Sequence, residues 1–331
     1  MIRGCSNRPE NPKVHAVGRL APSPTGDMHL GNLRTFLCAW LSIRANNGTL
    51  WMRVEDIDSS RVRALSLGSI LDDLTWFGLD WDGEPLIQSE RILEHQKALE
   101  TLQSKELAYP CICTRADVER AASAPHAGHQ GHHYPGACAK NTSASAKELT
   151  VPFAWRFRQD RESETFCDLV NGEVSEPGMG DFVIWKAGKG VQSVGPAYQL
   201  AVVLDDHFQG VTEVVRGNDL LGSTPKQIGI ARALGFPSPS WVHVPLVIGE
   251  DGLRLAKRHG DNKVASFRKQ KVPSDVLCGY LAWSLGWNEA KVPMTPKDLL
   301  QNWSWQLMTK TPWVLRKDIL KEMGFDPARA G

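Results

Sequence analysis

The chain has 331 residues, of which 42% are hydrophobic and 23% charged, and this composition is typical of a globular protein with one large domain or two modest ones. No apolar run approaches the roughly 20 residues that cross a bilayer, and the N-terminus has no apolar segment of a secretory signal, so we expect a cytoplasmic protein without membrane contacts. A net charge of +1 argues against binding nucleic acid through bulk electrostatics, although a local basic track for one RNA stays open.

The predicted elements begin with a short apolar strand at 17–20, a turn rich in proline and glycine, and an amphipathic helix at 30–45. Asn46, Asn47 and Gly48 are typical of a helix end. A second buried strand follows in TLWMRVED, and 65–77 and 92–107 carry helical periodicity. Strands that alternate with helices predict an α/β fold with a parallel sheet.

The alternation is interrupted from about residue 109, where Ala, Gly, His and Pro dominate and short strand-like runs such as FAWRFR and DFVIWKA follow. It resumes with 198–208, the strand TEVVR, a helix at 220–234 and the strand WVHVPLVIG, which together would complete the sheet. From residue 264 the pattern is helical only. We therefore expect an α/β domain at 1–108 and 196–260, an insertion at 109–195 and a helical stem at 261–331.

The first chemical motif is RLAPSPTGDMHLGN at 19–32, which delivers His29 to the start of a helix. Gly26 and Gly31 permit a close backbone approach. A helix that begins near Leu30 offers unpaired N–H groups and a positive dipole end to triphosphate oxygens, and His29 can add a hydrogen bond. The alternative is a strand-to-helix turn of any α/β protein, because HxG is common.

The second motif is RLAKR at 254–258, which follows a buried-looking strand and a glycine-bearing turn. When a carboxylate attacks the α-phosphorus of ATP, negative charge builds on phosphate oxygens as pyrophosphate leaves, and Lys257 on a closing loop could stabilise that charge. Catalysis would then consist of positioning and electrostatics. The alternative is a solvated basic face, the usual meaning of such a run.

The two motifs resemble those of the glutamate-type class I aminoacyl-tRNA synthetases, in which PSPTGxxHxGxxR carries the HIGH motif and a KLSKR-like loop the KMSKS motif. The resemblance extends through RVEDID, YQLAVVLDDHFQGVTEVVRGNDLLGSTPKQ and HVPLVIGEDGLRLAKR. The chain departs at Asn32, which replaces the last histidine of HIGH, and at Arg254 and Ala256, but it keeps the second lysine as Lys257. The resemblance implies a Rossmann-type parallel sheet with helices on both faces, and activation of glutamate by ATP with Mg²⁺.

The resemblance also implies an amino-acid site, in which Glu55 faces the α-ammonium while arginines bind carboxylates. Arginine suits that task because its planar fork binds a carboxylate bidentately. Considered singly, each residue is more often part of an exposed ion pair. The implied glutamate contacts are Arg19, Leu20, Ala21, Pro22, Ser23, Glu55, Tyr198 and Arg216, and the implied ATP contacts are His29, Gly31, Asn32 and Lys257, with His29 and Lys257 catalytic.

Three of the seven cysteines, Cys111, Cys113 and Cys138, lie close together, which in a cytosolic chain points to a metal before disulfides. Structural Zn²⁺ takes four N, S or O donors, and general chemistry favours one of the histidines between them as the fourth: His126, His129, His132 or His133. However, CxC followed by YxxxC resembles the glutamyl-Q tRNA(Asp) synthetases, a branch of the family in which the tyrosine is the ligand. We therefore predict Tyr134, with a metal-free loop of cysteines as the alternative.

This branch also fits the length of the chain, because ordinary glutamyl-tRNA synthetases continue into a large anticodon-binding region. Here only 261–331 follow the RLAKR loop, and their tryptophans suggest the core of a compact stem. The resemblance implies a monomer that activates glutamate without tRNA and transfers it to the queuosine base at the wobble position of tRNA(Asp). The alternatives are a truncated glutamyl-tRNA synthetase that charges a tRNA 3′ end and an inactive synthetase-like binding module.

Overall fold

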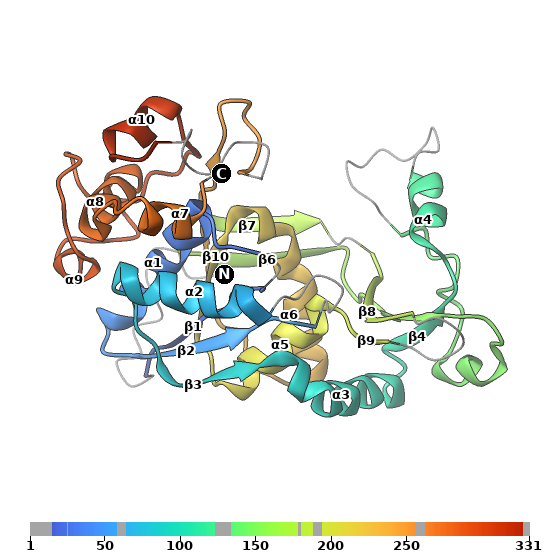
Figure 1. Ribbon diagram of the computed structural model, residues 1–331. Helices are drawn as coiled ribbons and strands as arrows, with labels where there is room; N and C mark the ends of the chain where they lie inside the picture. Colours follow the sequence, from blue (N-terminus) through green and yellow to red (C-terminus); the bar gives the residue numbers. More distant parts are fainter. Residues whose placement is uncertain are drawn as a thin grey trace.

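The computed structural model describes residues 15–24, 26–57, 64–122, 134–177, 180–187, 194–255 and 262–326. Parallel strands occupy the middle of the molecule, the C-terminal helices gather at one end, and an antiparallel sheet lies at the opposite end (Figure 1). No helix in these ranges is both long and apolar enough to cross a membrane.

The N-terminal part forms a parallel sheet with the order β1-β2-β3. Helix α1 ends at Arg44, and in the turn that follows it Asn47 adopts a φ of 50°. Gly48 then packs against Ala16, in the chain before β1. A Cβ atom on Gly48 would lie 2.3 Å from the carbonyl oxygen of Ala16, so only glycine fits there. The elements are β1 (Val17–Leu20), α1 (Leu30–Arg44), β2 (Thr49–Val54), α2 (Ala64–Phe77) and β3 (Asp82–Ile87).

A second sheet adjoins the first, because Thr212 donates its N–H to the Val17 carbonyl at 2.9 Å. Its order is β10-β11-β6-β7, in which β10, β11 and β6 are parallel and β7 returns as a hairpin. The segment 109–195 therefore contributes two strands to this sheet. The elements are β6 (Ser163–Asp168), β7 (Gly172–Pro177), α5 (Tyr198–Phe208), β10 (Glu213–Gly217), η4 (Asn218–Ser223), α6 (Thr224–Leu234) and β11 (Ser240–Val244).

The antiparallel sheet has the order β4-β5-β8-β9 and shares an apolar core with helices α3, α5 and α6. The helix predicted at 92–107 ends at Ser104, because its last residues turn into β4. The elements are η2 (Gln88–Arg91), α3 (Ile92–Ser104), β4 (Ala108–Cys111), α4 (Arg115–Ala122), η3 (Ser143–Glu148), β5 (Ala154–Phe157), β8 (Phe182–Lys186) and β9 (Gly195–Pro196).

The C-terminal part packs on α1 and α2 in one continuous core. Trp287, Trp303 and Trp305 contact one another with ring centroids 5.0 to 6.4 Å apart, so they are packing residues, as the sequence indicated. A two-residue strand, β13, pairs with β12, and this is too short to leave a periodicity in the sequence. The elements are β12 (Val247–Ile248), α7 (Val264–Lys269), α8 (Ser274–Ser284), α9 (Pro296–Leu299), β13 (Trp313–Val314) and α10 (Lys317–Glu322).

Candidate active site

Four residues of the expected amino-acid site converge where neighbouring parallel strands end. Arg19 lies on β1, Glu55 directly follows β2, Arg216 lies on β10 and Tyr198 begins α5. The charges of neighbouring members of the cluster influence the pKa of Glu55, of Tyr198 and of Arg216, so the four side chains lie close together. The carboxyl edge of an α/β sheet is where such folds bind ligands. The fold therefore brings these four residues together at the carboxyl edge of the parallel strands.

The segment 20–23 passes directly beside this cluster. Pro22 accepts a hydrogen bond from the Glu55 N–H at 3.0 Å, which joins the first motif to the end of β2. Leu20 and Pro22 are buried, Ala21 is half-buried and Ser23 is exposed. The segment is therefore held directly beside Glu55.

Arg19 and Glu55 belong to a buried ion-pair network that contains two further residues. Asp206 accepts from Arg19 Nε at 3.2 Å and from Arg53 Nη1 at 2.6 Å, while Arg53 Nη2 donates to Glu55 at 3.0 Å. Arg53 is fully buried. Because both Arg19 and Glu55 are held by internal partners, their side chains are oriented before any ligand arrives.

Arg216 differs from these arginines because its hydrogen-bond partners are neutral. Nε donates to His243 at 2.9 Å, Nη1 to Gln227 at 2.7 Å and Nη2 to Thr224 at 2.7 Å. Only 4% of the residue is exposed, and within the described part of the chain it forms no ion pair with a carboxylate. Burial lowers the pKa of Arg216. A buried cation without an anionic partner is costly, so this group is prepared for an anion.

Burial also shifts the pKa values of the two acidic side chains in the cluster, Glu55 and Tyr198. It raises the pKa of Glu55 although Arg53 and Arg19 counteract the shift, and it raises the pKa of Tyr198 together with the nearby Glu55. A cation beside Glu55 would favour its charged form. The cluster can therefore receive an ammonium group next to Glu55 and a carboxylate next to Arg216.

The motif around His29 is positioned by glycine and by the segment after the RLAKR loop. A Cβ on Gly31 would lie 3.1 Å from the His29 ring, so Gly31 leaves room for that ring. Burial and the nearby Arg254 lower the pKa of His29 to about 4, which keeps the imidazole neutral, and Nδ1 has no partner among the described residues. Contrary to the sequence prediction, two N–H groups at the start of α1 are paired: the Leu30 N–H donates to the Asn262 carbonyl at 3.1 Å and the Asn32 N–H to the His29 carbonyl at 2.9 Å.

Lys257 and Ala256 lie outside the described residues, but both flanks of their loop are described. On the first flank, Arg254 pairs with Asp219 at 2.5 Å and contributes to the charge environment of His29. On the second flank, Val264 donates its N–H to Met28 at 2.8 Å. The two ends of the loop therefore lie beside the start of α1.

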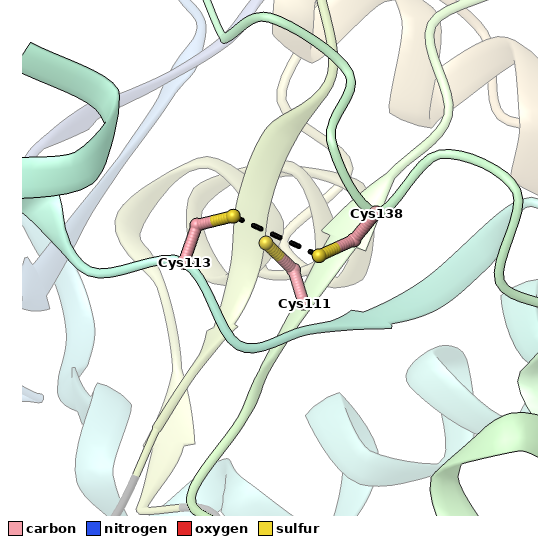
Figure 2. Close-up of side chains that lie close together, drawn as sticks. All are labelled: Cys111, Cys113 and Cys138. Carbon is pink, nitrogen blue, oxygen red and sulfur yellow. Dashed lines mark hydrogen bonds between the residues drawn. The ribbon is translucent and has the colours of Figure 1, made fainter. Parts of the chain in front are cut away.

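The three clustered cysteines come together as the sequence predicted (Figure 2). Their Sγ atoms all lie within 4.8 Å of one another, and Cys113 and Cys138 are 3.7 Å apart. The Tyr134 hydroxyl lies 3.4 Å from Cys111 Sγ and 3.9 Å from Cys113 Sγ. Ligand atoms about 2.3 Å from a tetrahedral zinc ion are about 3.8 Å apart. The four side chains thus fit one metal ion.

Two further contacts suit Tyr134 as a ligand. The Cys138 N–H donates to its hydroxyl oxygen at 2.8 Å, and the Arg156 guanidinium lies 3.7 Å from its ring centroid while donating to Cys111 Sγ at 3.2 Å. Both contacts favour negative charge on the ligand atoms. The histidines at 126, 129, 132 and 133 lie outside the described residues.

Sequence reasoning missed several residues that hold the site together. Asp206 had a visible signal, because the adjacent acids Asp205 and Asp206 interrupt the otherwise apolar run of α5. The acceptors around Arg216 had no such signal, because His243 reaches Arg216 only through strand pairing, and Thr224 and Gln227 reach it only through the packing of α6. The missed residues are Arg53, Asp168, Asp206, Thr224, Gln227 and His243.

Comparisons with known proteins agree with this geometry. The family model of the class I tRNA synthetases (E and Q), catalytic domain, matches residues 15–322. The glutamyl-Q tRNA(Asp) synthetase of Rhodopirellula baltica is 46% identical over 82% of this chain and 85% of its own length. That of Nocardia farcinica is 43% identical over 92% of this chain and 94% of its own length.

A longer relative and a solved structure complete the comparison. The glutamate–tRNA ligase of Aquifex aeolicus is 36% identical over 92% of this chain but 65% of its own length. The glutamate–tRNA synthetase structure from Elizabethkingia anophelis has a TM-score of 0.78 and 22% identity over 94% of this chain and 70% of its own, which shows the shared fold. The chain therefore belongs to the class I tRNA synthetases of the E and Q group and, within it, to the glutamyl-Q tRNA(Asp) synthetase family.

Proposed function

We propose that this chain activates glutamate with ATP, without tRNA, and transfers the glutamyl group to the queuosine base at the wobble position of tRNA(Asp). It is a ligase that forms an aminoacyl-adenylate. The observation that carries the choice of substrate is Arg216, a buried guanidinium whose described partners are neutral, beside the buried carboxylate of Glu55. Glutamate has the two carboxylates and the ammonium group that this cluster lacks.

In the proposed complex, Glu55 binds the α-ammonium, and Arg216 with Tyr198 binds the side-chain carboxylate. Arg19 and the segment Leu20, Ala21, Pro22 and Ser23 border the rest of the amino acid. Because the ion pairs of Arg53 and Asp206 hold these groups in advance, glutamate binds with little reorganisation. Its α-carboxylate is then left free to react.

The α-carboxylate attacks the α-phosphorus of ATP, the bond to the β-phosphate oxygen breaks, and pyrophosphate leaves with glutamyl-adenylate retained. His29, Gly31 and Asn32 are proposed to contact ATP, and His29 serves as a neutral hydrogen-bonding group. Lys257 is proposed to stabilise the charge that develops on phosphate oxygens, for which Mg²⁺ supplies further neutralisation. A hydroxyl of queuosine then attacks the glutamyl carbonyl and releases AMP.

We further propose that Cys111, Cys113, Tyr134 and Cys138 hold a structural Zn²⁺. Bound there, zinc supplies a cross-link between β4 and the segment before η3, and the separations of the four donor atoms support this assignment. We expect the protein to act as a monomer in the cytoplasm, where ATP and tRNA are available.

Glutamate-dependent exchange of pyrophosphate into ATP, measured without tRNA, tests the first half of the proposal. The expected result is exchange with glutamate and little with glutamine or aspartate. If exchange requires tRNA or is absent, a truncated glutamyl-tRNA synthetase or an inactive module is the better explanation. Mapping radiolabelled glutamate on tRNA tests the second half, since label on queuosine-containing tRNA(Asp) supports it and label at a 3′ end refutes it.

A further inference from the structure

A buried chain of hydrogen bonds runs across three neighbouring strands to Arg216. Asp168 ends β6, His243 lies on β11 and Arg216 lies on β10, directly opposite His243 in the strand register. Asp168 Oδ2 lies 2.7 Å from His243 Nδ1, and Arg216 Nε lies 2.9 Å from His243 Nε2. Asp168 and His243 are fully buried.

The donors around Asp168 determine the state of the imidazole. Asp168 accepts N–H bonds from the backbone of Val170, Asn171 and His243 and from the Asn171 side chain, all at 2.8 to 3.0 Å. With four N–H donors directed at it, Asp168 is the acceptor in this part of the network. His243 Nδ1 therefore carries the hydrogen. Because Arg216 donates to Nε2, that nitrogen is unprotonated, and burial, which lowers the pKa of His243, agrees with a neutral ring.

The Arg216 guanidinium has more N–H groups than these neutral side chains accept. A guanidinium has five N–H groups, and His243, Gln227 and Thr224 each take one. These three bonds leave one N–H group on each terminal nitrogen, and the two groups are available to the Tyr198 hydroxyl, which interacts with Arg216, and to a carboxylate bound bidentately. The guanidinium presents donors only, which suits a carboxylate better than the amide of glutamine.

We propose that His243, held as the Nδ1–H tautomer by Asp168, is a positioning residue that orients Arg216 toward the side-chain carboxylate of glutamate and so helps to exclude glutamine. This inference rests on the proposed function, because it assigns a specificity role within the same site. His243 acts through Arg216 and does not itself contact the substrate.

Two substitutions separate positioning from folding. His243→Gln keeps an acceptor near the position of Nε2, whereas His243→Leu removes it. We expect His243→Leu to raise the KM for glutamate at least about tenfold, to change kcat much less and to reduce the preference for glutamate over glutamine, because the guanidinium is no longer held. His243→Gln should stay within about threefold of the unsubstituted protein. Equal KM values for the unsubstituted protein and a folded His243→Leu variant would overturn the proposal.

A measurement on the unsubstituted protein does not depend on either variant folding well. Nitrogen-15 chemical shifts of the imidazoles report tautomers directly, and the spectrum of His243→Gln identifies the His243 signals. We expect Nδ1–H with an unprotonated Nε2 at pH 7, and an Nε2–H or cationic ring would refute the inference. If the protein shows no glutamate-dependent exchange, the proposed function fails, whereas a wrong tautomer with normal exchange defeats only the role of His243.

Discussion

Replacing Arg216 by glutamine is the most direct test of the amino-acid site. The substitution removes the buried cation and keeps a polar side chain near the acceptors Gln227, Thr224 and His243. If Arg216 binds the side-chain carboxylate of glutamate, the variant loses a bidentate, charge-assisted contact. If Arg216 only fills the core, the variant changes stability and leaves glutamate binding intact.

The expected magnitude follows from the type of contact. A hydrogen bond to a charged group contributes about 1.5–3 kcal/mol. A loss of about 3 kcal/mol corresponds to roughly a 100-fold lower kcat/KM for glutamate. The KM for ATP should change little, because Arg216 lies on β10 within the amino-acid cluster and is not among the proposed ATP contacts.

The assay is glutamate-dependent pyrophosphate exchange at several concentrations of glutamate and of ATP. Arg232→Gln is the matched control, since Arg232 lies on α6 and pairs with Glu164 and Asp160, which are not among the residues of the cluster. The control should keep its KM for glutamate. A folded Arg216→Gln protein with kcat/KM for glutamate within about threefold of the unsubstituted protein would refute the assignment of Arg216.

Three further changes test the other sites. Lys257→Ala should lower kcat about 100-fold with little change in the KM for glutamate, because the charge it stabilises develops only in the transition state. Tyr134→Phe should weaken zinc binding at least about tenfold in competition with a chelator, because it deletes one donor. His29→Gln should make unfolding in urea less pH-dependent. The folded pKa of His29 is about 4, below the unfolded value, so stability present above pH 6.5 is lost as pH falls toward 4, by about 3 kcal/mol.

Each of these changes has a control and a contrary outcome. Lys269→Ala, at the exposed end of α7, should leave exchange unchanged, and equal losses in kcat and glutamate affinity for Lys257→Ala would contradict its role. Tyr280→Phe should keep zinc, and if Tyr134→Phe also keeps it, the fourth ligand is another residue. For His29→Gln, a pH dependence of unfolding equal to that of the unsubstituted protein would contradict a depressed histidine pKa.

Much of the fold could be predicted because the signals are local. The strand predicted at 17–20 has the bounds that the structure gives it, and the helix predicted at 30–45 ends one residue earlier, at Arg44. Errors arose where local pattern and tertiary context disagree. The helix predicted at 220–234 is split into η4 and α6, since Pro225 favours a new helix start. Strand β13 exists only because β12 offers it a partner.

The sequence by itself determined the family and the cysteine cluster, because the motifs at 19–32 and 254–258 and the cysteines at 111, 113 and 138 are each carried by short stretches of the chain. Tertiary structure alone decided which buried charges are compensated. Arg19 and Arg216 look alike in the sequence, yet Asp206 pairs with the first, while neutral acceptors from β11 and the η4–α6 segment surround the second. That difference depends on partners 8 to 187 positions away in the chain, which only strand order and helix packing bring into contact.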